Sequence, residues 1–355
     1  MRFDTLMPAI LFLVTFAAMS LGRKAESKLK STVQEREFKT RDTILLVAMI
    51  AVAISIVVFI PSLAIMGLFL FSYSSLLFTV SYTFSDLKIN RLRLYLGGFA
   101  AASILAAVAG YLGVLPADLR LLGAASFVSL AAISLFVLLY VQRLSAIKPK
   151  WYIGALSPAL FLLLFAFFSN TFIWFPYLLD VYGIIFAILI VLYLNNLFTW
   201  KTVFIFAALL TGLDIVLVWV TGTMVQAAQQ ISGLGLPVLV AFPTIPIISS
   251  SEGILILRLG LGDFFFAGIL SSQTLKRFGK KTAVASLLTI CISFALFELI
   301  LLNPDLAKAL PVQALPATLP ILLGWLPVIL VKMYADKKKP KQAKTADPIA
   351  AIITP

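Results

Sequence analysis

Two hydrophobic stretches, ALLTGLDIVLVWVTGT at residues 208–223 and LRLGLGDFFFAGIL at residues 257–270, each contain one aspartate. A carboxylate within a membrane span costs about 2.5 to 3.5 kcal/mol on insertion scales, so Asp214 and Asp263 indicate a functional site. Two carboxylates placed face to face can share one proton and activate a water molecule. The two aspartates are therefore the first candidates for catalytic residues.

The composition around these stretches indicates a membrane protein. The chain has 355 residues, of which 61% are hydrophobic and 12% charged, and its mean hydropathy is +1.07. Crossing a hydrocarbon core of about 30 Å needs about 20 helical residues, and many apolar runs reach that length. They lack the two-residue alternation of a β-barrel strand. We expect an all-α, polytopic transmembrane helical bundle.

Apolar runs and the charged residues between them predict the individual spans. They are residues 5–22, 43–60, 62–85, 94–115, 120–142, 152–170, 177–199, 202–224, 256–275, 282–302 and 311–332. Residues 1–333 are expected to form one membrane-embedded domain, followed by a disordered cytoplasmic tail at 334–355. Between the two aspartate spans, Pro237, Pro243 and Pro246 predict an interrupted, re-entrant or mobile segment rather than a continuous helix.

The net charge of +13 is explained by basic residues between the spans. They gather in residues 23–41, 86–93, 143–150, 276–281 and the tail after 332, and an eleven-span model places all of these on one side. Positive loops favour the cytoplasm, so the N-terminus is predicted outside and the C-terminus inside. The lipid bilayer, and no nucleic acid, is the expected surrounding partner.

Several kinds of chemistry are excluded by missing residue types. The sequence has no histidine, which excludes Ser/His/Asp triads and zinc sites of the HExxH type, and its one cysteine, Cys291, cannot form an internal disulfide. No metal or organic cofactor is expected. Glu298, Asp180, Glu252 and Arg258 are interpreted as residues of helix contacts or interfaces without a catalytic role.

The two aspartates are predicted to lie at similar depth. Asp214 is midway along its span and Asp263 is in the next one, and consecutive spans run antiparallel. Gly212, Gly260 and Gly262 are expected to let the two helices approach closely. Glycines also permit local unwinding, which exposes backbone groups to a substrate strand.

Three ordered elements carry a resemblance to a known family. GLGD at residues 260–263 looks like a GxGD motif, and Asp214 with the following IVLVWVTGTMV is similar to a YD motif and the sequence after it. ALPATLPILLGWLPVIL at residues 314–330 resembles the region of a PAL motif. From about residue 202 to 332, the chain resembles the intramembrane aspartyl proteases of the presenilin and signal peptide peptidase group, as a prokaryotic homologue.

This resemblance implies a presenilin-like fold and an intramembrane aspartic endopeptidase that cleaves transmembrane segments of membrane proteins or signal peptides. Asp214 and Asp263 would be catalytic. The substrate-binding residues would be Gly260, Leu261, Gly262, Pro316, Ala317 and Thr318. The protease core is expected at roughly 62–333, with its catalytic part at 202–333.

The chain departs from the family pattern in three places. Leu213 stands where the family has tyrosine, and Thr318 stands where it has leucine. The family has nine spans, whereas eleven are predicted here, so the surplus lies upstream, either as two additional N-terminal spans or as an overcount, and the bundle is expected to have 9 to 11 spans. With the basic loops inside, the aspartate spans run as in signal peptide peptidase, which favours substrates whose N-terminus is cytoplasmic.

Two other functions fit buried carboxylates. A secondary transporter would use Asp214 and Asp263 as proton or cation sites, and a membrane scaffold would use them as helix contacts. No convincing internal repeat supports the transporter, which favours the protease. No asparagine begins an N-x-Ser/Thr sequon, and a microbial plasma membrane is the predicted location. The oligomeric state stays open.

Overall fold

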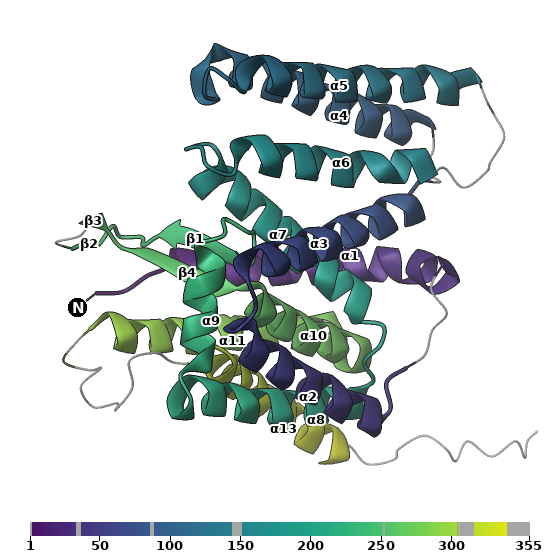
Figure 1. The fold of residues 1–355 in the computed structure, drawn as a ribbon. Coiled ribbons are helices and arrows are strands. Elements are labelled where there is room, and N and C mark those ends of the chain that lie inside the picture. The colour runs from purple at the N-terminus through teal and green to yellow at the C-terminus, as the bar shows by residue number, and fades with distance from the viewer. Residues whose placement is uncertain are drawn as a thin grey trace, which may run out of the picture.

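The computed structural model describes residues 2–32, 37–85, 89–143, 151–250, 253–303, 305 and 316–338. This part of the chain forms an all-α helical bundle with very little sheet (Figure 1). Nine of its helices are long and apolar enough to cross a membrane, and a shorter apolar stretch at Leu6–Gly22 starts the first helix. The protein is therefore a multi-pass membrane protein, and the predicted fold class is confirmed.

Each predicted span overlaps a helix. The predicted disordered tail 334–355 is wrong over its first five residues, since the helix Thr318–Lys338 covers them, and its remainder lies outside the described residues. The helices are α1 (Leu6–Thr32), α2 (Thr40–Val57), α3 (Ser62–Thr83), α4 (Ile89–Ala109), α5 (Arg120–Arg143), α6 (Trp151–Phe168), α7 (Leu179–Leu194), α8 (Trp200–Ile215), α9 (Thr223–Ser232), α10 (Leu261–Phe278), α11 (Lys280–Leu302) and α13 (Thr318–Lys338). Wider π-helical turns adjoin three of them, at η1 (Gly110–Val114), η2 (Trp174–Leu178) and η3 (Val216–Val220).

One predicted span begins as a strand. Residues Ile256–Gly260 form β4, which pairs antiparallel with β1 (Leu239–Pro243), so the predicted span 256–275 is wrong over its first five residues. The prolines end helical structure after α9, which leaves β1 available as a partner. A smaller hairpin, β2 (Ser249–Ser250) with β3 (Gly253–Ile254), lies between these strands.

The helices divide into a packed body and a peripheral pair. α8, α10 and α13 contact one another, and α1 packs against α7, α10 and α11. α4 and α5 pack mainly on each other and on α6, and Figure 1 shows them at the edge of the bundle farthest from α8 and α13. Residues before 62, which we placed outside the protease core, are thus part of the packed body through α1.

Two glycines allow close helix contacts in this body. A Cβ added to Gly268 of α10 would lie 2.4 Å from Cγ2 of Val191 in α7, and one added to Gly324 of α13 would lie 2.5 Å from the backbone oxygen of Thr289 in α11. Small residues allow such approach in membranes, where van der Waals packing drives helix association. These contacts position α10 and α13, which carry residues of the candidate site.

Candidate active site

Asp263 is held by the start of its own helix. Strand β4 runs directly into α10, with Gly260 as the N-cap residue and Asp263 in the first turn. The partly exposed carboxylate accepts a hydrogen bond from the backbone N–H of Gly260. This is the half of a capping box in which the third helical residue reaches back to the N-cap. The GLGD sequence therefore sets the position of this carboxylate locally.

Asp214 is held from a distant part of the chain. It lies in the last turn of α8 and is 9% exposed. The hydroxyl of Thr318, the first residue of α13, donates to its Oδ2 at 2.5 Å, and the backbone N–H of Thr318 donates to the same carboxylate. A short O–H···O contact of this kind is typical of a charge-assisted hydrogen bond. Thr318 thus contacts the predicted catalytic residue itself.

The two carboxylates are close enough to interact electrostatically. α8 and α10 contact each other and both contact α13, so the three motif-bearing segments meet in one place. α8 ends and α10 begins at the same end of the bundle, where β1 and β4 also lie (Figure 1). Three segments far apart in sequence therefore form a single site around Asp214 and Asp263.

The glycines beside the aspartates leave open space. We expected Gly212 and Gly262 to bring the two helices together, but a Cβ on either one would meet no atom within 4 Å, and both residues are exposed. That expectation was wrong, because the close contacts of α10 are made further along, at Gly268. Gly260 differs, since its added Cβ would lie 3.1 Å from Oδ2 of Asp263. Gly262 therefore leaves space next to Asp263, whereas Gly212, two residues before Asp214, opens on another face of α8.

The other residues of the predicted substrate site are mostly packed. Leu261 is 5% exposed and belongs to the hydrophobic core, and its amide donates to the carbonyl of Val238. Pro316 is buried, while Ala317 is partly buried against the same core. Leu213 also packs partly buried there. These side chains support the backbone around the carboxylates, and Gly262 is the one that faces open space.

Sequence reasoning missed the role of Asp180. This buried residue of α7 accepts the backbone N–H of Ala241 in β1 at 2.7 Å, so the N–H of Ala241 points away from β4.

In the described part of the chain, the outer edge of β4 carries unpaired backbone groups. In an antiparallel pair, two opposite residues turn their N–H and C=O groups either both toward each other or both outward. Arg258 lies opposite Ala241, so its N–H and C=O point to the outer edge of β4. Among the described residues no strand pairs with that edge. A row of backbone groups therefore leads toward Asp263.

Another carboxylate is buried away from the aspartate pair. Glu298 of α11 is 7% exposed, and its Oε2 has no hydrogen-bond partner among the described residues. It interacts electrostatically with Asp4, which caps α1 by accepting the amide of Met7 at 2.8 Å and also accepts the amide of Ile245 at 2.7 Å. The expected helix contact of Glu298 is thus with the start of α1, outside the candidate site.

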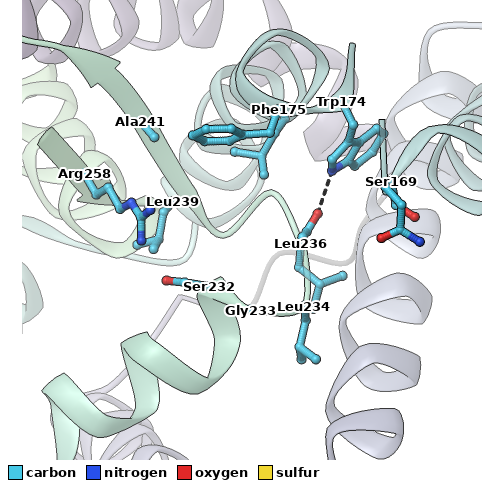
Figure 2. A pocket seen from close by; sticks show the side chains of 13 residues that line it. Ser169, Trp174, Phe175, Ser232, Gly233, Leu234, Leu236, Leu239, Ala241 and Arg258 are labelled. Carbon is cyan, nitrogen blue, oxygen red and sulfur yellow. Dashed lines mark hydrogen bonds between the residues drawn. The ribbon is translucent and has the colours of Figure 1, made fainter. Parts of the chain in front are cut away.

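A separate pocket of about 280 Å³ lies beside the β1–β4 ribbon (Figure 2). Neither aspartate lines it. Its walls come from the turn around η2, the turn after α9, and the ribbon, from which Arg258 contributes. Because β4 continues into α10, this pocket is linked by a short segment to Asp263.

Comparison with known proteins adds no assignment. The chain matches no known family model, and no curated protein matches it.

Proposed function

We propose that this protein is an intramembrane aspartic endopeptidase of the presenilin and signal peptide peptidase type, which hydrolyses peptide bonds within transmembrane segments. One observation carries the proposal: the carboxylates of Asp214 in α8 and Asp263 in α10, from two apolar stretches, are brought within electrostatic reach of each other. Burying two like charges together is costly in a membrane, so a pair at one place favours chemistry that uses both carboxylates.

The pair supplies the chemistry of an aspartic protease. Two carboxylates at short distance share one proton, because both cannot be ionised together at low cost. The ionised carboxylate takes a proton from water, whose oxygen attacks the scissile carbonyl carbon while the protonated carboxyl gives its proton to the carbonyl oxygen. When the C–N bond breaks, the proton taken from water passes to the leaving amine, and a hydroxyl of the tetrahedral intermediate returns a proton to the other carboxylate, which restores the pair. We assign the ionised role to Asp214, since the Thr318 hydroxyl and amide both donate to it.

The free edge of β4 supports a peptide substrate. A transmembrane helix must unwind before its peptide bond can be attacked, and the exposed backbone then needs hydrogen-bond partners in an apolar surrounding. The outer edge of β4 offers such partners at Arg258 and Ile256, directly before Asp263. An unwound segment would add to the ribbon as a third strand, in the manner of β-augmentation.

The helix arrangement supports a nine-span core with an insertion. Without the peripheral pair α4 and α5, seven of the nine long apolar helices of the described chain remain, and α1 and α10, which pack among them, bring the bundle to nine. We expected the surplus at the N-terminus. α1 instead packs against α10 and α11, so we propose that the hairpin α4–α5 is the surplus and that the protease core includes α1.

The proposed orientation places the N-terminus outside and the C-terminus in the cytoplasm, in a microbial plasma membrane. Lys276 at the end of α10 donates to Asn196 in the turn before α8, so basic and polar groups meet at the end proposed to be cytoplasmic. Substrates would then enter with a cytoplasmic N-terminus. Labelling that found residues 226–249 accessible from the cytoplasm would contradict this orientation.

The decisive experiment uses the purified full chain in liposomes with a transmembrane peptide. We expect cuts within the membrane segment, and Asp214→Asn and Asp263→Asn should each lower the rate at least about 1,000-fold. Glu298→Gln is a matched control, since it neutralises a buried carboxylate outside the pair and should leave cleavage unchanged. Absence of wild-type cuts, or full activity of either Asp→Asn variant, would reject the protease. A solute flux lost in both variants would favour the transporter.

A further inference from the structure

The pocket beside the β1–β4 ribbon has the chemistry of an anion site. Among the described residues that line it, Arg258 is the one charged side chain, and Ser232 at the end of α9 also lines it (Figure 2). Ser169 and Asn170 add polar groups on the far wall. A cation beside neutral polar groups, with no carboxylate among the described lining residues, favours a negatively charged group.

The walls of the pocket are fixed. The indole N–H of Trp174 donates to the carbonyl of Gly235 at 2.7 Å, which connects η2 to the turn after α9, as Figure 2 shows. The ribbon wall is held by the bond from Ala241 to Asp180. Polar and apolar atoms therefore line a preformed space, into which a short side chain with a charged end can fit.

The position of Arg258 is unusual for its charge. On the proposed topology it lies on the outer side, where membrane proteins carry few basic residues. It also lies on β4, two residues before Gly260, which is about 7 Å along a strand. A substrate group bound at Arg258 would thus lie within a few residues of the substrate peptide bond that is cleaved at Asp263.

We propose that this pocket binds a carboxylate of the substrate, carried by an acidic side chain in the segment that flanks the cleavage site on the outer side. The proposal rests on the protease function. A guanidinium matches a carboxylate with two parallel N–H···O bonds. One cation balances one carboxylate, and the adjoining β4 edge is where the substrate backbone is expected to pair. The pocket would then select substrates by charge and fix their register.

A charge exchange tests this assignment. Transmembrane peptides that differ only in Glu, Gln or Lys at one flanking position, scanned over the outer flank, are cleaved by the full chain in liposomes of neutral lipid. For one position we expect the wild type to prefer Glu over Gln about tenfold in kcat/KM. Arg258→Gln should remove the preference, and Arg258→Glu should turn it toward Lys. Arg120→Gln removes another arginine of the same proposed side and should keep the wild-type preference.

Other outcomes separate this proposal from the function on which it rests. Equal cleavage of all three peptides at every position, or the same preference in Arg258→Glu, would overturn the carboxylate pocket while leaving the protease intact. Cleavage that depends on anionic lipid through Arg258, whatever the peptide, would assign the pocket to a lipid headgroup. Binding of the Glu and Gln peptides to Asp263→Asn tests the pocket without catalysis, and equal affinities would also overturn it.

Discussion

The two aspartates of the candidate site are held in opposite ways. Asp263 accepts the amide of Gly260, three residues earlier, at the start of its own helix. Asp214 accepts the hydroxyl of Thr318, 104 residues later, at the start of α13. The first arrangement is local and the second requires the packing of the whole bundle. Changes in α13 should therefore affect Asp214 and leave Asp263 in place.

The largest effect is expected from Gly324→Ala, which attacks the packing of α13. The new Cβ would lie 2.5 Å from the backbone oxygen of Thr289 and 2.6 Å from Cα of Ile290, and backbone atoms cannot move aside cheaply. Overpacking of this kind costs about 1 to 3 kcal/mol. We expect a lower Tm in detergent and loss of cleavage, because α13 carries Thr318. Gly97→Ala in α4, where the Cβ meets nothing within 4 Å, is the control. Equal Tm values for the two variants would contradict the close contact.

Thr318→Val tests the hydrogen bond from α13 to Asp214 directly, and its expected effect is smaller. Valine keeps the shape of threonine but removes the hydroxyl that donates to Asp214. A hydrogen bond to a charged group contributes about 1.5 to 3 kcal/mol, which corresponds to a fall in kcat of roughly 10- to 150-fold. KM should stay within about twofold if the bond acts on the reacting carboxylate rather than on substrate binding. Thr318→Ser retains a hydroxyl and should recover most of the rate. Equal rates for the valine and serine variants would show that the hydroxyl does not position Asp214.

Gly268→Ala tests the helix of Asp263 and should have a moderate effect. Its Cβ would lie 2.4 Å from Cγ2 of Val191, a side chain that can partly yield, so we expect a loss of about 1 to 2 kcal/mol. The double variant Gly268→Ala with Val191→Ala removes the clash and should recover the Tm. Failure of this rescue would mean that α10 is not held against α7 at this point.

Hydropathy was sufficient to predict the long helices and to single out the two aspartates, although it did not predict the short helix α9. A bilayer imposes a minimum length on each span and makes a buried carboxylate expensive, so the spans and Asp214 and Asp263 are visible in the sequence. Their approach follows from the antiparallel order of neighbouring spans. These features depend on local composition, which can be read from a single sequence.

The missed features depend on contacts between distant segments. The hydropathy of Ile256–Gly260 does not distinguish this segment from the apolar helix that follows it. Its pairing with β1 makes it a strand. Gly212 lies two residues before Asp214 and so faces another side of α8, but what packs against that side depends on the tertiary structure. Thr318 looked like a departure from the family motif because its bond to Asp214 exists only when α13 packs on α8.

The smallest effect is expected from Tyr95→Phe, in the peripheral pair. The Tyr95 hydroxyl joins α4 to α6 and α3 through Ser157 at 2.7 Å and Ser81 at 3.2 Å. Hydrogen bonds between membrane helices contribute about 0.6 kcal/mol on average, so the Tm should fall slightly and cleavage should not change. Both aspartates would keep their partners, since neither depends on α4. A loss of cleavage as large as that of Thr318→Val would show that α4–α5 supports the site. The position of Asp214 would then depend on helices other than α13.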